Sequence, residues 1–349
     1  MRVGHREHVV TIVGVEAPSY WADLVGFLGS PDDAGPSLMT IIVESRPCSW
    51  TGPAAREVLV DCGLNLRGWV DRTWPFTTWA GIREPVTAPW DVQLTDGSHL
   101  HWEPLSSALR VCPAQPGGGD LYAWQAARAV VTASACQGGH AIAHGAVVAV
   151  DGSAVLLAGA KGAGKTSFLL TLLSAGDPHI AFVSNDKSLM RGGDVTGLPF
   201  ALTLTPDTIT RFPAVSAAAR GRTAGGKHLA WMSELMDVPR LTSAPLAGVA
   251  AVRISPQIEC EAASFAAAAA AVASTAEVSL AMLPPFPAAA VGLGPPRLLG
   301  VPAATPVLEL SAFPPASPVA VVDALRSALS RPTASDTPDA DATRTLQES

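Results

Sequence analysis

The segment from residue 159 to residue 167 carries the clearest chemical pattern in the chain. It reads Gly-Ala-Lys-Gly-Ala-Gly-Lys-Thr-Ser, which is a complete Walker A motif. Glycines let the backbone curl so that successive N–H groups point at a phosphate, and the helix that follows adds the positive end of its dipole. The motif assigns the β- and γ-phosphates to Lys165 and a Mg²⁺ ion to the hydroxyl of Thr166. The sequence therefore predicts a site for ATP or GTP with Mg²⁺.

A strand and a helix must flank such a loop for it to hold a phosphate. Residues 154–158 form a short apolar run that suits a buried parallel strand, and residues 167–175 have helical spacing that ends at Gly176. This order favours a nucleotide site over an accidental glycine-rich turn. We expect the whole motif to line the nucleotide: Gly159, Ala160, Lys161, Gly162, Ala163, Gly164, Lys165, Thr166 and Ser167.

Two further features lie at informative distances from the loop. Upstream, a strand-like run that contains His144 and Gly145 continues through residues 146–150, and Asp151-Gly152 then turns the chain into the Walker strand. This predicts a β-hairpin that leads into the loop. Downstream, residues 182–186 read as an apolar strand that ends in Asp186, where a second-strand Walker-type aspartate is expected.

Together these features resemble the catalytic domain of HPr kinase/phosphorylase, and especially the diverged HPr-kinase-like proteins of bacterial biosynthetic clusters. The resemblance spans roughly residues 137–204. It implies an α/β fold built on a P-loop nucleotide-binding sheet of the HPr kinase and phosphoenolpyruvate carboxykinase type. It also implies dependence on Mg²⁺ and transfer of phosphate to a hydroxyl.

The resemblance also implies roles for single residues. Lys165 and Thr166 match the phosphate lysine and the metal-side hydroxyl, and His144 matches the histidine near the transferred phosphate. Asp186 matches the second member of an Asp-Asp pair that serves proton transfer and metal binding. The implied catalytic residues are therefore Asp186, His144 and Lys165, and the implied metal ligands are Thr166 and Asp186. A satisfied histidine at a strand edge is the structural alternative for His144.

Two positions depart from the family pattern. Asn185 replaces the first aspartate of the pair, and Ser167 replaces a glutamate that follows the loop in the bifunctional enzymes. An amide cannot accept a proton, although it can orient a hydroxyl, ligate Mg²⁺ or cap a turn. Positioning and charge neutralisation carry most of phosphoryl transfer, so a single carboxylate is compatible with a kinase. The reverse phosphorylase reaction is not expected.

Length and composition indicate a globular chain with two domains and a tail. The 349 residues are 48% hydrophobic and 15% charged. We expect an N-terminal Trp-rich α/β domain over residues 1–120, a P-loop domain over 121–331, and a disordered tail rich in Ser, Thr, Asp and Pro over 332–349. The tryptophans of the first domain are expected to pack its core rather than to line a ligand groove.

Hydrophobic periodicity places the other elements. In the N-terminal domain it predicts strands at 9–13 and 39–43 and a hairpin of 90–94 with 99–102. A helix predicted over 121–136 would cross into the P-loop domain. In the P-loop domain it predicts strands at 146–150, 154–158, 181–183, 201–204 and 248–254, with helices over 262–276 and 319–329.

Charge and cysteine content indicate the cellular environment and the classes of partner to expect. The net charge of −7 and the scattered basic residues argue against a nucleic-acid partner. The five cysteines are Cys48, Cys62, Cys112, Cys136 and Cys260. Their number is odd and no two form a CxxC pair, so we expect free thiols in a reducing cytosol. No signal peptide is recognised, and residues 262–276 are too short and too alanine-rich to span a bilayer. We therefore expect a cytoplasmic protein without a membrane partner.

The function that these patterns favour is an ATP-dependent kinase that transfers the γ-phosphate to a hydroxyl of a protein, a peptide or a small molecule. The N-terminal domain would recognise the acceptor or mediate assembly, and a homo-oligomer is left open. The alternative is a nucleotide-binding regulator or scaffold with little or no phosphotransfer, which Asn185 favours. A motor-type ATPase is disfavoured because the chain has no LSGGQ-like signature.

Overall fold

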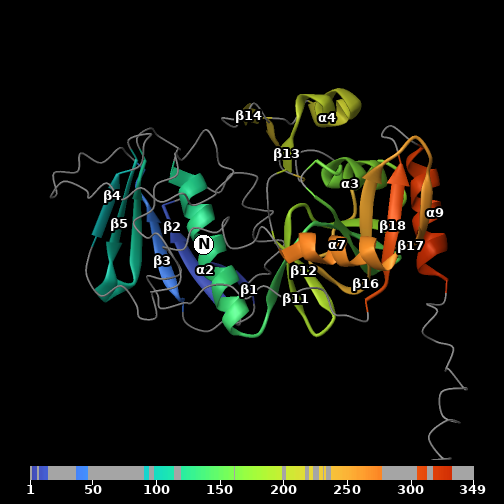
Figure 1. Cartoon of the computed structure of the whole chain (residues 1–349). Helices are drawn as coiled ribbons and strands as arrows, with labels where there is room; N and C mark the ends of the chain where they lie inside the picture. Colours follow the sequence, from blue (N-terminus) through green and yellow to red (C-terminus); the bar gives the residue numbers. More distant parts are fainter. Residues whose placement is uncertain are drawn as a thin grey trace, which may run out of the picture.

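Two large β-sheets and a small three-stranded one organise the described part of the chain (Figure 1). The structure is a computed structural model that describes residues 2–5, 8–14, 37–45, 90–93, 98–113, 119–160, 162–198, 202–216, 220–222, 228–230, 232, 237–276, 305–312 and 317–331. Parallel and antiparallel pairings occur in both large sheets, and helices accompany each. The fold is therefore a mixed α/β fold, as the sequence predicts.

The N-terminal sheet has the strand order β1-β2-β3-β6-β5-β4. Its strands are β1 (Arg2–His5), β2 (His8–Val13), β3 (Met39–Val43), β4 (Trp90–Gln93), β5 (His99–Glu103) and β6 (Ala108–Cys112). The expected strands at 9–13 and 39–43 and the β4–β5 antiparallel pair are confirmed. Alternate residues of β3 are buried, which is the pattern of a strand with one face on a core. Trp102, only 1% exposed, belongs to that core.

The long helix α2 (Gly119–Gln137) covers the N-terminal sheet and continues toward the second one (Figure 1). It contacts β1, β2, β3 and β6, and its C-terminal part leads into β7 (Ala141–His144), which it also contacts. The helix confirms the expectation for 121–136. The division of the chain at residue 120 stays a prediction, and the tail over 332–349 lies outside the described residues.

The expectation of free thiols throughout is wrong for Cys112. This residue, at the end of β6, is disulfide-bonded. Cys136 and Cys260 are reduced thiols, as expected. Spacing along the sequence does not reveal such a bond, because the distance between two cysteines is set by the tertiary fold.

The second sheet carries the Walker A segment and has nine strands. Seven follow the order β10-β8-β9-β16-β12-β11-β7. The long strand β16 also pairs with β18, and β18 pairs with β17. The strands not yet given are β8 (Ala146–Val150), β9 (Ser153–Ala158), β10 (Ile180–Ser184), β11 (Lys187–Arg191), β12 (Asp194–Gly197), β16 (Ser243–Ile254), β17 (Glu259–Ala262) and β18 (Val307–Ala312). The predicted strands at 146–150, 154–158, 181–183 and 248–254 are all present.

The predicted hairpin into the Walker strand is confirmed. Strands β8 and β9 pair antiparallel from Ala146–Leu157 to Val150–Ser153, with Asp151 and Gly152 in the turn at positive φ. The hairpin changes the neighbours of the Walker strand. Because β8 lies on one side of β9 and β16 lies parallel to it on the other, β10 pairs antiparallel with β8 instead. The strand expected at 182–186 ends at Ser184, so Asp186 lies in the turn after β10 and not at its last position, and its role stays a prediction.

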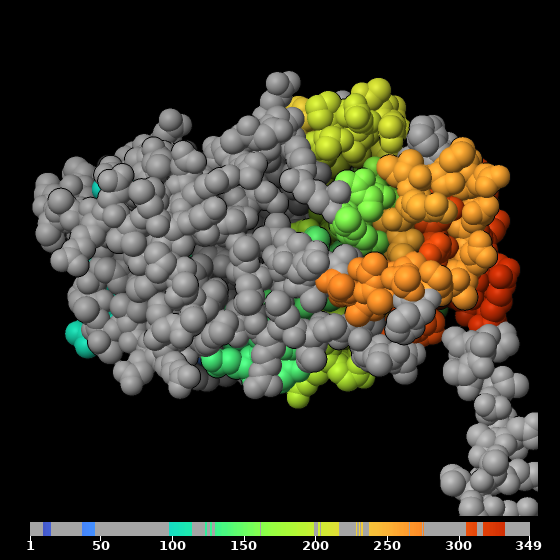
Figure 2. Space-filling model, viewed as in Figure 1, coloured from blue at the N-terminus to red at the C-terminus, as the bar shows by residue number. Residues whose placement is uncertain are grey.

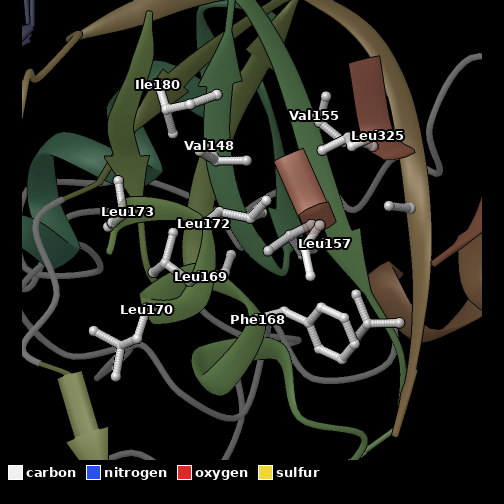
Figure 3. Packing of buried hydrophobic residues seen from close by; sticks show 14 of the residues in the cluster. Val148, Val155, Leu157, Phe168, Leu169, Leu170, Leu172, Leu173, Ile180 and Leu325 are labelled. Atoms are coloured by element: carbon white, nitrogen blue, oxygen red, sulfur yellow. The ribbon is translucent and has the colours of Figure 1, made fainter. Parts of the chain in front are cut away.

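A helix packs the core of this sheet directly behind the Walker A segment (Figure 3). Helix α3 (Lys165–Leu173) begins two residues earlier than the predicted 167–175, and nearly its whole length is buried. Phe168, Leu169 and Leu172 belong to one cluster with apolar side chains of β8, β9 and β10, and with Leu325 of α9 (Pro318–Leu329). Full burial of each such side chain contributes about 1.5–3 kcal/mol, so the packing of α3 fixes the end of the loop before it.

Three smaller elements share the hydrophobic core of α3. A three-stranded sheet has the order β13-β15-β14, with β13 (Leu202–Leu204), β15 (His228–Ala230) and β14 (Arg220–Arg222). After β13 come the short helices α4 (Pro206–Arg211) and α5 (Pro213–Ser216), whose apolar residues join the α3 core. Figure 2 shows α4 at the surface next to α3. Strand β13 confirms the expectation for 201–204.

Two more helices of the described residues pack on the second sheet. Helix α7 (Phe265–Ala276) contacts β7, β9 and β16, and the first residues of the predicted 262–276 helix instead end β17. Helix α9 confirms the expectation for 319–329 and is tied to the rest of the fold by Arg326. That guanidinium donates to both carboxylate oxygens of Asp151 at 2.9 Å and to Asp177 at 2.6 Å. None of the helices in the described part of the chain has the length and apolar character that crossing a bilayer requires.

Candidate functional site

The Walker A segment connects β9 to α3 as a glycine-rich turn. Gly159, Gly162 and Gly164 have φ of 151°, 90° and 97°, which side chains with a Cβ rarely adopt. A Cβ on Gly159 would lie 2.9 Å from that of Ala163, so this position also needs glycine for space. Strand, glycine loop and helix therefore occur in the predicted order. Lys161 lies outside the described residues.

The side chain of Lys165 folds back into the loop that precedes it. Its ammonium donates to the carbonyl oxygens of Gly159 at 2.6 Å and of Ala160 at 3.2 Å. Burial lowers the pKa of Lys165, and the negative charge of Asp186 opposes that shift. The loop thus holds a partly desolvated cation whose hydrogen-bond partners are neutral carbonyl groups.

The first turn of α3 presents backbone N–H groups that have no partner within the helix. Gly164 is the N-cap and supplies no side-chain acceptor, and the first helical bond runs from the N–H of Phe168 to Gly164. The preceding N–H groups therefore have no intrahelical partner. Thr166 is partly exposed and Ser167 is 9% exposed, so of these two hydroxyls that of Thr166 is the more accessible.

A second part of the site comes from the junction of β7 and β8. His144 is the last residue of β7, and Gly145 joins that strand to the Walker hairpin. A Cβ on Gly145 would lie 2.7 Å from the carbonyl oxygen of Leu157, so only glycine fits this close approach. The N–H of Gly145 donates to the carbonyl oxygen of Asp186 at 2.8 Å. This bond places His144 beside the β10–β11 turn.

Asp186 lies in that turn, and both of its carboxylate oxygens face basic groups. Its Oδ1 is 3.3 Å from Nε2 of His144, and its Oδ2 is 3.3 Å from Nζ of Lys187. The side chain of Asp186 is 28% exposed, that of His144 is 12% exposed, and that of Lys187 is fully buried. The structure thus brings His144 and Asp186 into contact. The negative charge of Asp186 also acts on Lys165.

The surroundings of Asp186 favour the ionised carboxylate. Burial alone would raise its pKa, but the charge of Lys187 and the hydrogen bond with His144 outweigh burial and hold the pKa well below its usual range. A carboxylate with so low a pKa is a weak proton acceptor. It can orient a hydroxyl or counter a charge more readily than it can remove a proton.

Sequence reasoning missed Lys187 and the hairpin that it begins. Strands β11 and β12 pair antiparallel and are joined by a turn at Gly192 and Gly193, whose φ values of 60° and 92° suit a type I′ turn. That Gly-Gly pair was the available signal for the hairpin. The burial of Lys187 had no signal, because a lysine at the start of a strand is usually solvated. Asn185 is 7% exposed, and its direct role stays a prediction.

The residues present accommodate a Mg²⁺ ion on the Thr166 side more readily than on the Asp186 side. Mg²⁺ in nucleotide sites takes few protein ligands and keeps several waters beside the phosphates. A direct bond to Asp186 would bring the ion next to the buried Lys187 ammonium. Among the described residues, no group of three or more His, Cys, Asp or Glu side chains could hold a metal ion.

Comparison with known proteins gives a distant likeness among solved structures. No protein-family model matches the chain, and no curated protein matches its sequence. Among solved structures it is similar to the HPr(Ser) kinase/phosphatase from Coxiella burnetii, with 9% identity and a TM-score of 0.27 over 53% of this chain and 88% of that chain.

Proposed function

We propose that the chain binds a nucleoside triphosphate, ATP in the first place, at residues 159–167 and transfers its γ-phosphate to a hydroxyl. One observation carries the proposal, namely the Lys165 ammonium held at 2.6 Å from the Gly159 carbonyl inside a glycine loop. A partly desolvated cation gains more from a polyphosphate than from carbonyl oxygens, since charge-assisted hydrogen bonds are about twice as strong as neutral ones. Phosphate oxygens would replace those carbonyls as the partners of Lys165.

The loop supplies the remaining phosphate contacts. The N–H groups of Lys165, Thr166 and Ser167 stand at the start of α3 without helical partners, where the helix dipole favours an anion. We assign Mg²⁺ to the hydroxyl of Thr166, and we assign Asp186 to the acceptor side of the site. When bound with the nucleotide, Mg²⁺ would offset the charge of the β- and γ-phosphates.

Asp186 and His144 form the side of the site that would face the acceptor. The Asp186 carboxylate accepts a hydrogen bond from the acceptor hydroxyl and orients its oxygen toward the γ-phosphorus. His144 fixes the carboxylate from one side at 3.3 Å. Phosphoryl transfer depends mainly on positioning and charge stabilisation, so a carboxylate of low basicity is sufficient for this role.

The acceptor class that we propose is a hydroxyl of a protein, a peptide or a small molecule. Nucleic acid is a poor candidate because the chain carries a net charge of −7. The experiment is to incubate the purified chain with γ-labelled ATP, Mg²⁺ and a cell extract, and to follow label into protein, peptide and small-molecule fractions. The Lys165→Ala variant is the control, and we expect it to bind ATP about 10–100-fold more weakly, as loss of a charged hydrogen-bond donor would give.

A second candidate function is a nucleotide-binding regulator or scaffold with little phosphotransfer. The pairing of Asp186 with Lys187 favours it, because the only carboxylate in this turn is already neutralised. Binding of ATP without any transfer of label would select this function. Equal ATP affinity in the wild type and in Lys165→Ala would contradict both functions.

A further inference from the structure

Lys187 is a charged residue without any exposure to solvent, and the mechanism above does not use it. Its side chain has an exposed fraction of 0%, and its ammonium lies 3.3 Å from Oδ2 of Asp186. A buried ammonium is costly unless a counter-charge compensates it, and the same holds for a carboxylate. The two side chains are therefore one electrostatic unit.

The backbone holds Lys187 in this place from two sides. It is the first residue of β11 and lies directly opposite His144 of β7 in the antiparallel register. Its carbonyl oxygen accepts hydrogen bonds from the N–H of Leu198 at 3.2 Å and from the buried hydroxyl of Ser184. The backbone of Lys187 is therefore fixed at the start of the strand, and its buried side chain reaches Asp186 from there.

The Asp186–Lys187 pair also affects Lys165. Asp186 lies close to the loop, because its carbonyl oxygen accepts the N–H of Gly145, and Gly145 packs against the carbonyl oxygen of Leu157, two residues before Gly159. From this place its negative charge opposes the lowering of the Lys165 pKa by burial. If Lys187 were absent, the uncompensated carboxylate would attract the Lys165 ammonium and would repel an incoming triphosphate. Both effects weaken nucleotide binding, and both disappear when the carboxylate is neutral.

We propose that Lys187 is a positioning residue that compensates the charge of Asp186 and so leaves Lys165 available to the triphosphate. The inference rests on the proposed nucleotide site and deepens it. Lys187 itself need not contact the nucleotide. It allows one carboxylate to stand beside a polyanion site without competing for the lysine of that site.

Three variants test the inference by the dissociation constant of Mg²⁺–ATP measured by calorimetry. In Lys187→Met, the uncompensated Asp186 should weaken binding by about 10-fold or more. In Asp186→Asn, binding should be no weaker than in the wild type. In the double variant Asp186→Asn/Lys187→Met, affinity should return to within about 3-fold of the wild type, because both charges are gone.

The matched control is Arg191→Met. Arg191 lies on the same strand and is exposed, so the change removes a positive charge without touching Asp186. Its affinity for Mg²⁺–ATP should equal that of the wild type. An equal loss in Arg191→Met and Lys187→Met would overturn the inference in favour of a general effect of net charge.

The double variant keeps the test decisive if Lys187→Met fails to fold. Replacement of a whole buried ion pair by neutral side chains is often tolerated, whereas removal of one partner is not. A folded double variant that binds Mg²⁺–ATP more than about 10-fold more weakly than the wild type overturns the inference. A folded Lys187→Met variant with wild-type affinity overturns it too. A wild-type chain that binds ATP without transferring phosphate would refute the kinase proposal alone, because this test measures binding.

Discussion

His144 and Lys187 face each other across the β7–β11 ladder, and both reach the carboxylate of Asp186. Side chains directly opposite each other on antiparallel strands lie on the same face of the sheet. The turn before β11 returns Asp186 to that face, where its carbonyl oxygen accepts the N–H of Gly145. Two strands and one turn thus hold a single carboxylate beside the Walker A segment.

Asp186→Asn should reduce transfer of phosphate by at least about 100-fold, because an amide does not supply the negative charge that orients the acceptor hydroxyl. The variant also leaves Lys187 buried without its counter-charge, which costs about 3–5 kcal/mol of stability. Rates must therefore be measured on folded protein, with the melting temperature recorded alongside. The double variant with Lys187→Met should regain stability while transfer stays low. Wild-type turnover in either variant would place the acceptor-orienting group elsewhere.

Asn185→Asp tests the departure from the Asp-Asp pair. If the amide prevents proton relay, the wild type should not remove phosphate from a phosphorylated product in the presence of excess inorganic phosphate or pyrophosphate. The variant should transfer phosphate faster or should permit some reversal, because a second carboxylate could then pass on the proton. Both directions are measured in both proteins. Efficient dephosphorylation by the wild type would show that Asn185 is no obstacle.

Gly145→Ala should destabilise the protein by overpacking. The added Cβ would lie 2.7 Å from the carbonyl oxygen of Leu157 and from Cδ1 of Leu156, and overpacking of this kind typically costs about 1–3 kcal/mol. The matched variant is Gly192→Ala, where φ is 60° and nothing lies within 4 Å of the new Cβ. That change carries only the cost of a left-handed backbone, about 1–2 kcal/mol. Urea unfolding gives both values, and the ATP affinity should fall only for Gly145→Ala, because only that change displaces the His144 strand end.

Arg326→Met should lower the melting temperature by a few degrees at most near neutral pH, since exposed ion pairs contribute little. The hydrogen bond from Arg326, followed by that from the N–H of His179, lowers the pKa of Asp177 from its usual 3.8. A lowered carboxyl pKa stabilises the fold fully above the usual value and loses that effect as the pH falls through the folded-state pKa. The wild-type advantage over Arg326→Met should therefore shrink below pH 3.8. Arg191→Met, which removes an exposed arginine, serves as control, and a wild-type advantage that does not change with pH would contradict the assignment to Asp177.

The sequence by itself determined the local elements around the Walker A segment. Glycines at positions of positive φ, an apolar run before them and helical spacing after them specify a strand, a loop and a helix. The β8–β9 hairpin was equally readable, since Asp151-Gly152 joins two apolar runs. These predictions succeed because each depends on residues that are neighbours in the chain.

Only the tertiary structure decided which of these elements become neighbours. The hairpin separates β10 from β9, so Asp186 does not end a strand next to the Walker strand but lies in a turn that Gly145 fixes. The burial of Lys187 and the disulfide of Cys112 likewise depend on contacts between distant segments. Sequence patterns report the preference of each segment for a helix or a strand. They do not show which charged side chains pair with each other in the interior, because that depends on the register of strands such as β7 and β11.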